Sequence, residues 1–140
     1  MYTFGSPAEV LEAVGRTYGP GPWVEVSQER VDAFTDATGD HQSVHVGFAT
    51  AQPYLTLSML PFLSLDVLAY DGCSARMNYG VEQVRFPRAP LVGSRVRACA
   101  EVVAASRTAA GVRITLRWRV EIEGDATPAC VADTVAVLVP

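Results

Sequence analysis

Both histidines of this 140-residue sequence lie within five residues of one another, directly after an aspartate. Asp40 follows Gly39, which stands where a glycine caps a helix C-terminus, so the carboxyl group lies beyond the negative end of a helix dipole. That position disfavours an ionised carboxylate and suits a group that must hold and transfer a proton. His45 can share a water or a substrate proton with Asp40. The spacing suggests an acid–base pair, and a turn aspartate beside a buried histidine is the structural alternative.

Other catalytic chemistries find weaker support. His41 and His45 form an HxxxH pair, but Gly39 predicts that the helix has already ended, and no Glu follows His41, so we expect no metal site. No G-x-S-x-G motif is present for a serine nucleophile. All 11 basic residues are arginine, which excludes Schiff-base and P-loop lysine chemistry. We expect no cofactor.

Charge and cysteine usage narrow the class of protein. The formal net charge is −4, so no basic field is present to hold nucleic acid. Four arginines surround a proline-rich turn, where they either keep a sheet face solvated, which we favour, or meet the phosphates of a carrier. These are Arg85, Arg88, Arg95 and Arg97. Three widely spaced cysteines without a CxxC motif argue against a disulfide framework and a zinc ribbon, namely Cys73, Cys99 and Cys130.

The chain carries no signal for export or membrane insertion. Its first ten residues lack a basic segment and an apolar signal core. The longest apolar stretch, residues 54–68, is broken by Pro61, carries Asp66 and is too short to span a bilayer. We therefore expect a cytoplasmic protein with no membrane contact.

Three helices are predicted in the first half of the chain. Residues 7–14 begin with the serine cap and first-turn proline that favour helix initiation. Residues 28–38 lie between Ser27 as N-cap and Gly39 as C-cap. A third helix over residues 51–65 is apolar all round, which is typical of a helix enclosed by other structure.

Strands are predicted mainly in the second half. Residues 112–123 alternate apolar and polar side chains, which is typical of a half-buried antiparallel strand. Residues 95–102 alternate in the same way. Further strands are expected at residues 23–26, 77–86 and 129–138. Helices followed by strands, with one apolar helix left to bury, predict a single α+β domain over residues 1–140.

Several motifs resemble those of one enzyme family. Residues 27–45 closely resemble the hydratase motif of the MaoC-like, or NodN-like, enoyl-thioester hydratases, and the most specific part is TGD-x4-H. The resemblance covers nearly the whole chain. It continues through Tyr54 to Pro61, Asn78 to Pro87, Pro90 to Arg97 and Pro128 to Ala132.

The resemblance implies a hot-dog fold, in which an antiparallel β-sheet wraps around a long central apolar helix and two copies pair as a homodimer. It implies hydration of an (R)-type enoyl-CoA or enoyl-carrier-protein thioester, or the reverse dehydration. Asp40 and His45 match the catalytic pair of the family, which would activate a water for attack at the β-carbon. Donors at the start of the central helix would steady the enolate oxygen. Substrate contacts are implied for Gln52, Pro53, Tyr54 and Ser58.

Two departures from the family pattern affect the site. The family commonly reads I-A-H-G before Y-L-T-L-S, and the glycine N–H donates to the thioester oxygen, but residues 50–53 read TAQP. Pro53 has no N–H to donate. The Gln52 amide and the Tyr54 N–H are the alternative donors. The segment between His45 and the central helix is also shorter than usual.

Three functions therefore remain open. The first is a hydratase or dehydratase acting on enoyl and 3-hydroxyacyl thioesters. The second is a repurposed hot-dog enzyme that dehydrates or cyclises a polyketide-like intermediate, and the third is a non-catalytic acyl-binding subunit. The acid–base pair favours the first two, and Pro53 favours the second over the first. The length of the match places the hydratase ahead.

Overall fold

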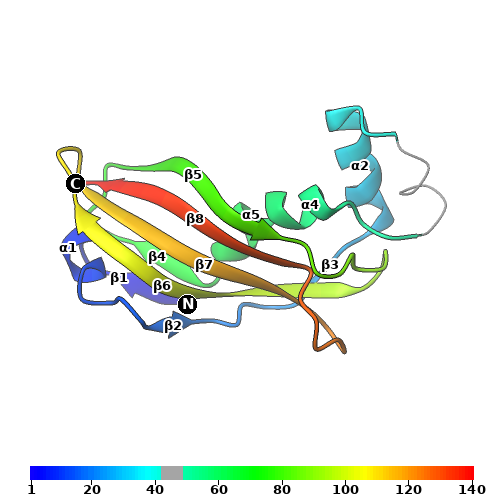
Figure 1. Cartoon of the computed structure of the whole chain (residues 1–140), viewed down its shortest axis with the longest axis horizontal. Coiled ribbons are helices and arrows are strands. Elements are labelled where there is room, and N and C mark those ends of the chain that lie inside the picture. Colours follow the sequence, from blue (N-terminus) through cyan, green and yellow to red (C-terminus); the bar gives the residue numbers. More distant parts are fainter. Residues whose placement is uncertain (42–48) are drawn as a thin grey trace.

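A curved six-stranded antiparallel sheet forms the body of the molecule in a computed structural model that describes residues 1–41 and 49–140. Neighbouring strands of this sheet pair in the order β2-β6-β7-β8-β5, and β3 also pairs with β6 (Figure 1). β5 lies at one edge of the sheet. The strands are β2 (Thr17–Tyr18), β3 (Val24–Glu25), β5 (Ala75–Arg85), β6 (Arg95–Arg107), β7 (Val112–Ile122) and β8 (Cys130–Val139).

The alternation in the sequence explains the two faces of this sheet. Ile114, Trp118 and Val120 of β7 are buried, whereas Arg117 and Arg119 between them face outward. Because successive side chains of a strand point to opposite faces, one face packs on the core and the other meets water. The four strands predicted in the second half are confirmed, with β6 continuing beyond the predicted end to Arg107.

The helix predicted over residues 28–38 is confirmed as α2, Gln28–Thr38. The Ser27 hydroxyl accepts from the Arg30 N–H at 3.2 Å, and Gly39 ends the helix in the left-handed conformation with φ 71°. The first helix is shorter than predicted. It ends at Val10 as α1 (Pro7–Val10), because the next N–H groups bond to carbonyls only three residues back.

The prediction of one enclosed helix over residues 51–65 is wrong in two respects. Two short helices occupy the segment, α4 (Pro53–Ser58) and α5 (Leu60–Ser64), because Pro61 has no N–H for a bond to the carbonyl one turn earlier. The apolar character does not reflect complete burial either. One face packs on the sheet through Leu55, Met59 and Leu63, and the opposite face is exposed. The exposed apolar residues on it are Tyr54, Phe62 and Leu65.

A small second sheet was not predicted from the sequence. β1 (Tyr2–Phe4) pairs in parallel with β4 (Leu68–Tyr70) beneath the main sheet. Phe4 is 1% exposed and its ring stacks on Tyr70 at a centroid distance of 5.6 Å. This pairing ties the N-terminus to the end of the α4–α5 segment. Within the described residues, no helix is long and apolar enough to cross a membrane.

Candidate active site

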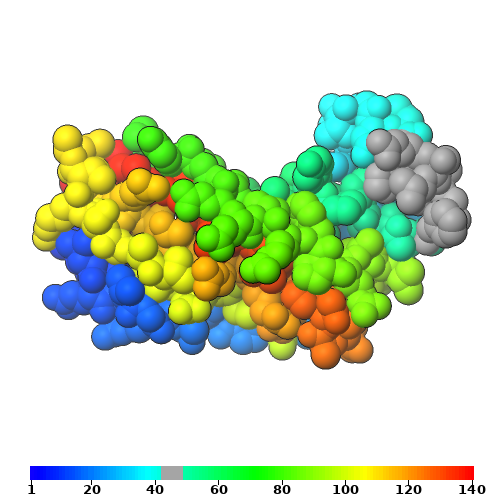
Figure 2. Space-filling model, viewed as in Figure 1, coloured from blue at the N-terminus to red at the C-terminus, as the bar shows by residue number. Residues whose placement is uncertain are grey.

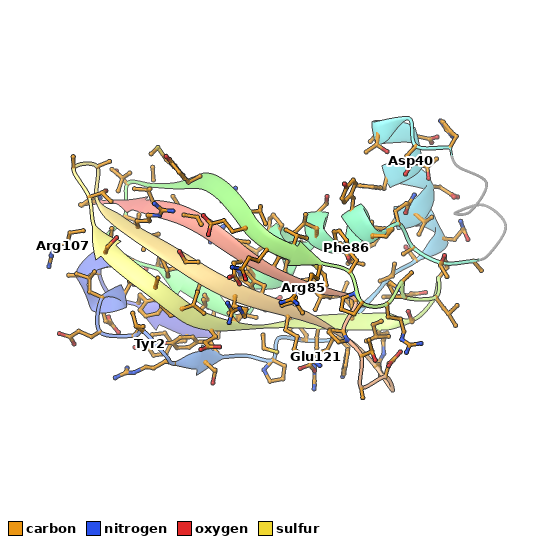
Figure 3. All side chains as sticks on the ribbon, in the orientation of Figure 1. Tyr2, Asp40, Arg85, Phe86, Arg107 and Glu121 are labelled. Carbon is orange, nitrogen blue, oxygen red and sulfur yellow. The ribbon has the colours of Figure 1, made fainter. Side chains whose placement is uncertain are left out.

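Asp40 emerges from the C-terminus of α2, where the sequence places it. The Gly39 N–H bonds to the Thr35 carbonyl at 2.9 Å and closes the helix, and the Asp40 N–H reaches the Thr38 hydroxyl at 3.4 Å. Asp40 is half-buried. Figure 3 shows it at the end of α2 that points away from the sheet. His45, its predicted partner, lies outside the described residues.

Gln52 is buried between α2 and α4. Its side chain is 1% exposed, although it is polar. The Nε2 amide donates to the Val31 carbonyl at 3.3 Å and to the Thr35 hydroxyl at 2.7 Å. Since an amide nitrogen carries two hydrogens, both are engaged. Gln52 thus joins two helices, a role that the sequence analysis did not identify.

Pro53 and Tyr54 occupy the first turn of α4. Pro53 is its first residue, a position where a proline is well tolerated because the missing N–H would have no partner within the helix. The first backbone N–H of α4 therefore belongs to Tyr54. The Tyr54 side chain is exposed, and its ring contacts the Phe86 ring edge-on at a centroid distance of 5.7 Å.

An apolar cavity of about 300 Å³ lies between the helices and the edge of the sheet. Figure 2 shows the surface hollowed between β5 and α2, above the helices α4 and α5. Ser58 lies on the wall of the cavity, Trp118 is a large apolar side chain in it, and Arg76 lines it beside the Tyr70 ring. The Trp118 Nε1 donates to the Thr134 hydroxyl at 3.1 Å, so the indole is fixed in place. The sequence pattern predicted Trp118 as core but gave no signal for a cavity.

The arginines around the proline-rich turn are largely engaged with carboxylates. Arg88 pairs with Asp125 at 2.9 Å and Arg97 with Glu121 at 3.0 Å, and Arg95 pairs with Glu123. These pairs support the solvated sheet face over a phosphate site. Among the described residues, Arg85 has no carboxylate within 4.0 Å.

The cysteines do not form a nucleophilic centre. All three are free thiols. Burial, together with the hydrogen bond to Glu121, raises the pKa of Cys99 to about 11, and burial likewise raises the pKa of Cys130 to about 11. Thiols in such settings stay protonated near neutral pH and are poor nucleophiles.

Comparison with known proteins places the chain in a family. No family model matches it. The 3-hydroxyacyl-thioester dehydratase Z of Mycobacterium tuberculosis is 40% identical over 146 aligned residues, which cover 96% of this chain and 97% of the relative. Nodulation protein N of Rhizobium leguminosarum is 31% identical, with 95% of this chain and 91% of the relative covered.

Solved structures agree on the fold. An R-hydratase from Pseudomonas aeruginosa superposes with a TM-score of 0.72 at 17% identity, covering 95% of this chain and 84% of that chain. A MaoC-like dehydratase from Rhodospirillum rubrum gives 0.70 at 14% identity, covering 91% and 94%. These likenesses show the hot-dog fold, and the resemblance read from the sequence is confirmed by the full-length relatives. The chain is a member of the MaoC-like family of lyases, the hydratases and dehydratases of enoyl and 3-hydroxyacyl thioesters.

Proposed function

We propose that this protein interconverts an enoyl thioester and a 3-hydroxyacyl thioester, with Asp40 and His45 as its acid–base pair. One observation carries the proposal. Asp40 stands directly beyond the Gly39 cap of α2, half-buried, in a chain that aligns along almost its whole length with a 3-hydroxyacyl-thioester dehydratase. A carboxyl group at this position can accept and return a proton, as general acid–base catalysis requires.

In the hydration direction, Asp40 and His45 hold a water and remove one of its protons. The water oxygen forms a bond to the β-carbon while the electrons of the double bond move toward the thioester, giving an enolate. The proton returns at the α-carbon and completes the 3-hydroxyacyl thioester. Dehydration is the same sequence in reverse, and general acid–base catalysis of this kind contributes about 10²–10⁴-fold in rate.

The hydrogen-bond donor to the enolate oxygen is the part of the proposed site that departs most from the family pattern. Pro53 has no N–H, and both N–H groups of the Gln52 amide are engaged with Val31 and Thr35. The backbone N–H of Tyr54 is then the donor that the start of α4 offers. Loss of one such donor typically costs about 2.7–4 kcal/mol in the transition state, so we expect a slower enzyme than a family member with glycine here.

We assign the acyl chain to the cavity that Ser58 and Trp118 line. It begins one turn beyond Tyr54 along α4 and is walled by apolar side chains, which suits the tail of an acyl group. The carrier is coenzyme A or an acyl-carrier protein.

We further propose a homodimer in the cytoplasm. Apolar side chains are exposed on the helices and on the neighbouring edge strand β5, among them Phe62, Leu65 and Tyr79. An exposed apolar patch beside an unpaired strand edge favours association with another chain. The three free cysteines suit a reducing compartment.

A second candidate reaction is favoured by Pro53 alone. Dehydration or ring closure of a bulky polyketide-like intermediate depends on proton transfer more than on a strong oxyanion site. The two functions separate on substrate size. Purified protein is mixed with a short enoyl-CoA, and loss of the conjugated thioester absorbance is followed. Turnover supports the hydratase; a folded protein that ignores short enoyl-CoA and converts only bulky intermediates supports the second candidate.

A further inference from the structure

α2 carries Asp40 but is attached to the rest of the protein by few groups. Val31 is its buried side chain, and the Arg30 guanidinium lies over the Phe62 ring at 5.1 Å. Within residues 1–41 and 49–140, every hydrogen bond that joins α2 to another element comes from the Gln52 side chain. Among the same residues, the remaining hydrogen bonds of α2 stay within the helix, its caps and the adjoining Asp40.

The Gln52 bonds reach the part of α2 that leads to Asp40. The stronger of the two, at 2.7 Å, ends on the Thr35 hydroxyl. The carbonyl of that same residue accepts from the Gly39 N–H at 2.9 Å, and Asp40 follows directly. The orientation of the amide is unambiguous, because the Val31 carbonyl can only accept a hydrogen bond. Because the two acceptors lie one helical turn apart, the bonds fix the position of α2 along its axis and its rotation about that axis.

Gln52 is itself held firmly. The preceding residue, Ala51, is 1% exposed and donates its N–H to the Pro90 carbonyl at 2.9 Å. On the other side, Pro53 starts α4, and the Gln52 carbonyl accepts from the Leu55 N–H at 3.0 Å. The Gln52 side chain thus links the position of α2 to that of α4 and of the loop between β5 and β6.

The side-chain amide of Gln52 acts in this structure as a hydrogen-bond donor and not as an acceptor. The Gln52 Oε1 is buried and has no hydrogen-bond partner among the described residues. A buried carbonyl without a donor is unfavourable, and an apolar side chain of similar size would avoid that cost while filling the same space. What an apolar side chain lacks is the pair of N–H groups that hold α2.

We propose that Gln52 is a positioning residue for the reaction, one that holds α2 so that Asp40 keeps its place relative to the start of α4. The inference rests on the proposed role of Asp40. It assigns Gln52 an indirect role, since its N–H groups are directed at Val31 and Thr35 and not at a substrate.

The test compares variants that remove the two partners separately and together. Gln52→Leu keeps the volume and removes both bonds, Thr35→Val removes the hydroxyl with little change of shape, and Gln52→His restores a ring N–H.

We expect Gln52→Leu to lower kcat about tenfold or more while KM changes less than about threefold, because misplacement of a catalytic group slows chemistry more than binding. Thr35→Val lowers kcat less. The double variant is no slower than Gln52→Leu, and Gln52→His recovers part of the rate.

Thr56→Val serves as the matched control, since it removes a fully buried hydroxyl of α4 that bonds to the Pro53 carbonyl and not to α2. Hydrogen exchange gives a readout independent of turnover. In Gln52→Leu the amides of residues 33–39 exchange faster, while those of β7 and β8 keep their protection.

The outcomes separate the two proposals. If the wild-type protein turns over no enoyl thioester, the proposed function fails and this inference fails with it. If the wild type is active, three results overturn only the role of Gln52: unchanged kcat in folded Gln52→Leu, additive losses in the double variant, or unchanged exchange in α2.

Discussion

In the proposed site, Pro53 determines which N–H group can donate to the enolate oxygen. A proline fits the first position of α4 without strain, so its effect falls on chemistry and not on folding. Its ring removes the first backbone N–H, and the engaged amide of Gln52 does not replace it. The proposed site therefore works with the Tyr54 N–H as donor.

Replacing Pro53 by glycine restores an N–H at the first position of α4. We expect Pro53→Gly to raise kcat/KM for a short enoyl-CoA by about tenfold or more, since one oxyanion donor is typically worth about 10²–10³-fold in kcat. Steady-state kinetics checks this.

Pro7→Gly is the matched control, because Pro7 is also the first residue of a helix but belongs to α1 and does not line the cavity. An equal rise in both variants, or no rise in folded Pro53→Gly, would show that the enolate oxygen is not held at this position.

Individual site residues differ in how far the sequence reveals them. Gly39 and Asp40 could be recognised from the sequence, because the residues next to a helix C-terminus themselves indicate where the helix ends. Gln52 and Thr35 are 17 residues apart, Thr35 within α2 and Gln52 at the N-cap of α4. No periodic pattern links them, so their hydrogen bond becomes visible only in the folded chain. The placement of His45 stays a prediction.

Among the elements, the strands were the most predictable. β7 and residues 96–102 of β6 are buried on one face only, so buried and more exposed positions alternate regularly along these two strands. The α4–α5 segment was predicted as one helix because its composition is apolar throughout, whereas Pro61 divides it. Its outer face is exposed, and the sequence alone does not distinguish exposed apolar residues from core residues. β1 and β4 are three-residue strands that pair across more than sixty residues, which leaves no local pattern.

The cavity between these elements predicts acyl-chain selectivity. Ala136 of β8 lines it, and a phenylalanine there would fill part of its volume of about 300 Å³. We expect Ala136→Phe to lower kcat/KM for long enoyl-CoA by about tenfold or more and to spare short enoyl-CoA, because a pocket that cannot relax excludes added methylenes.

A chain-length series measured for both proteins checks this. Ala104→Phe on β6 is the control, since this residue is exposed and lies away from the cavity. Parallel losses across all chain lengths, or none, would place the acyl chain elsewhere.

At the scale of the whole molecule, the exposed apolar surface of the α4–α5 segment and β5 favours association with another chain. Exposed apolar side chains lie on the outer face of the α4–α5 segment and on β5, the sheet edge that carries exposed Met77, Tyr79 and Val81. Apolar side chains along an open strand edge are a liability in a monomer. A second copy of the chain would cover them, as the proposed homodimer requires.

We therefore expect the protein to elute as a dimer and Leu65→Glu to shift it toward the monomer. Leu65 is 63% exposed, so the substitution leaves the core of the chain intact but places a charge in the interface. Light scattering coupled to size exclusion measures the mass. A wild-type monomer, or a Leu65→Glu variant that stays dimeric over a range of concentrations, would contradict this assignment of the surface.

The most direct test of the account is hydration of a short enoyl-CoA by the wild-type protein and by Asp40→Asn, measured side by side with substrate binding. The amide occupies the same space as the carboxyl group but cannot take a proton from water. The account predicts turnover by the wild type, a loss of about 10²–10⁴-fold in kcat for Asp40→Asn, and retained binding. Equal turnover by the two proteins, or binding without any turnover by a folded wild type, would contradict it.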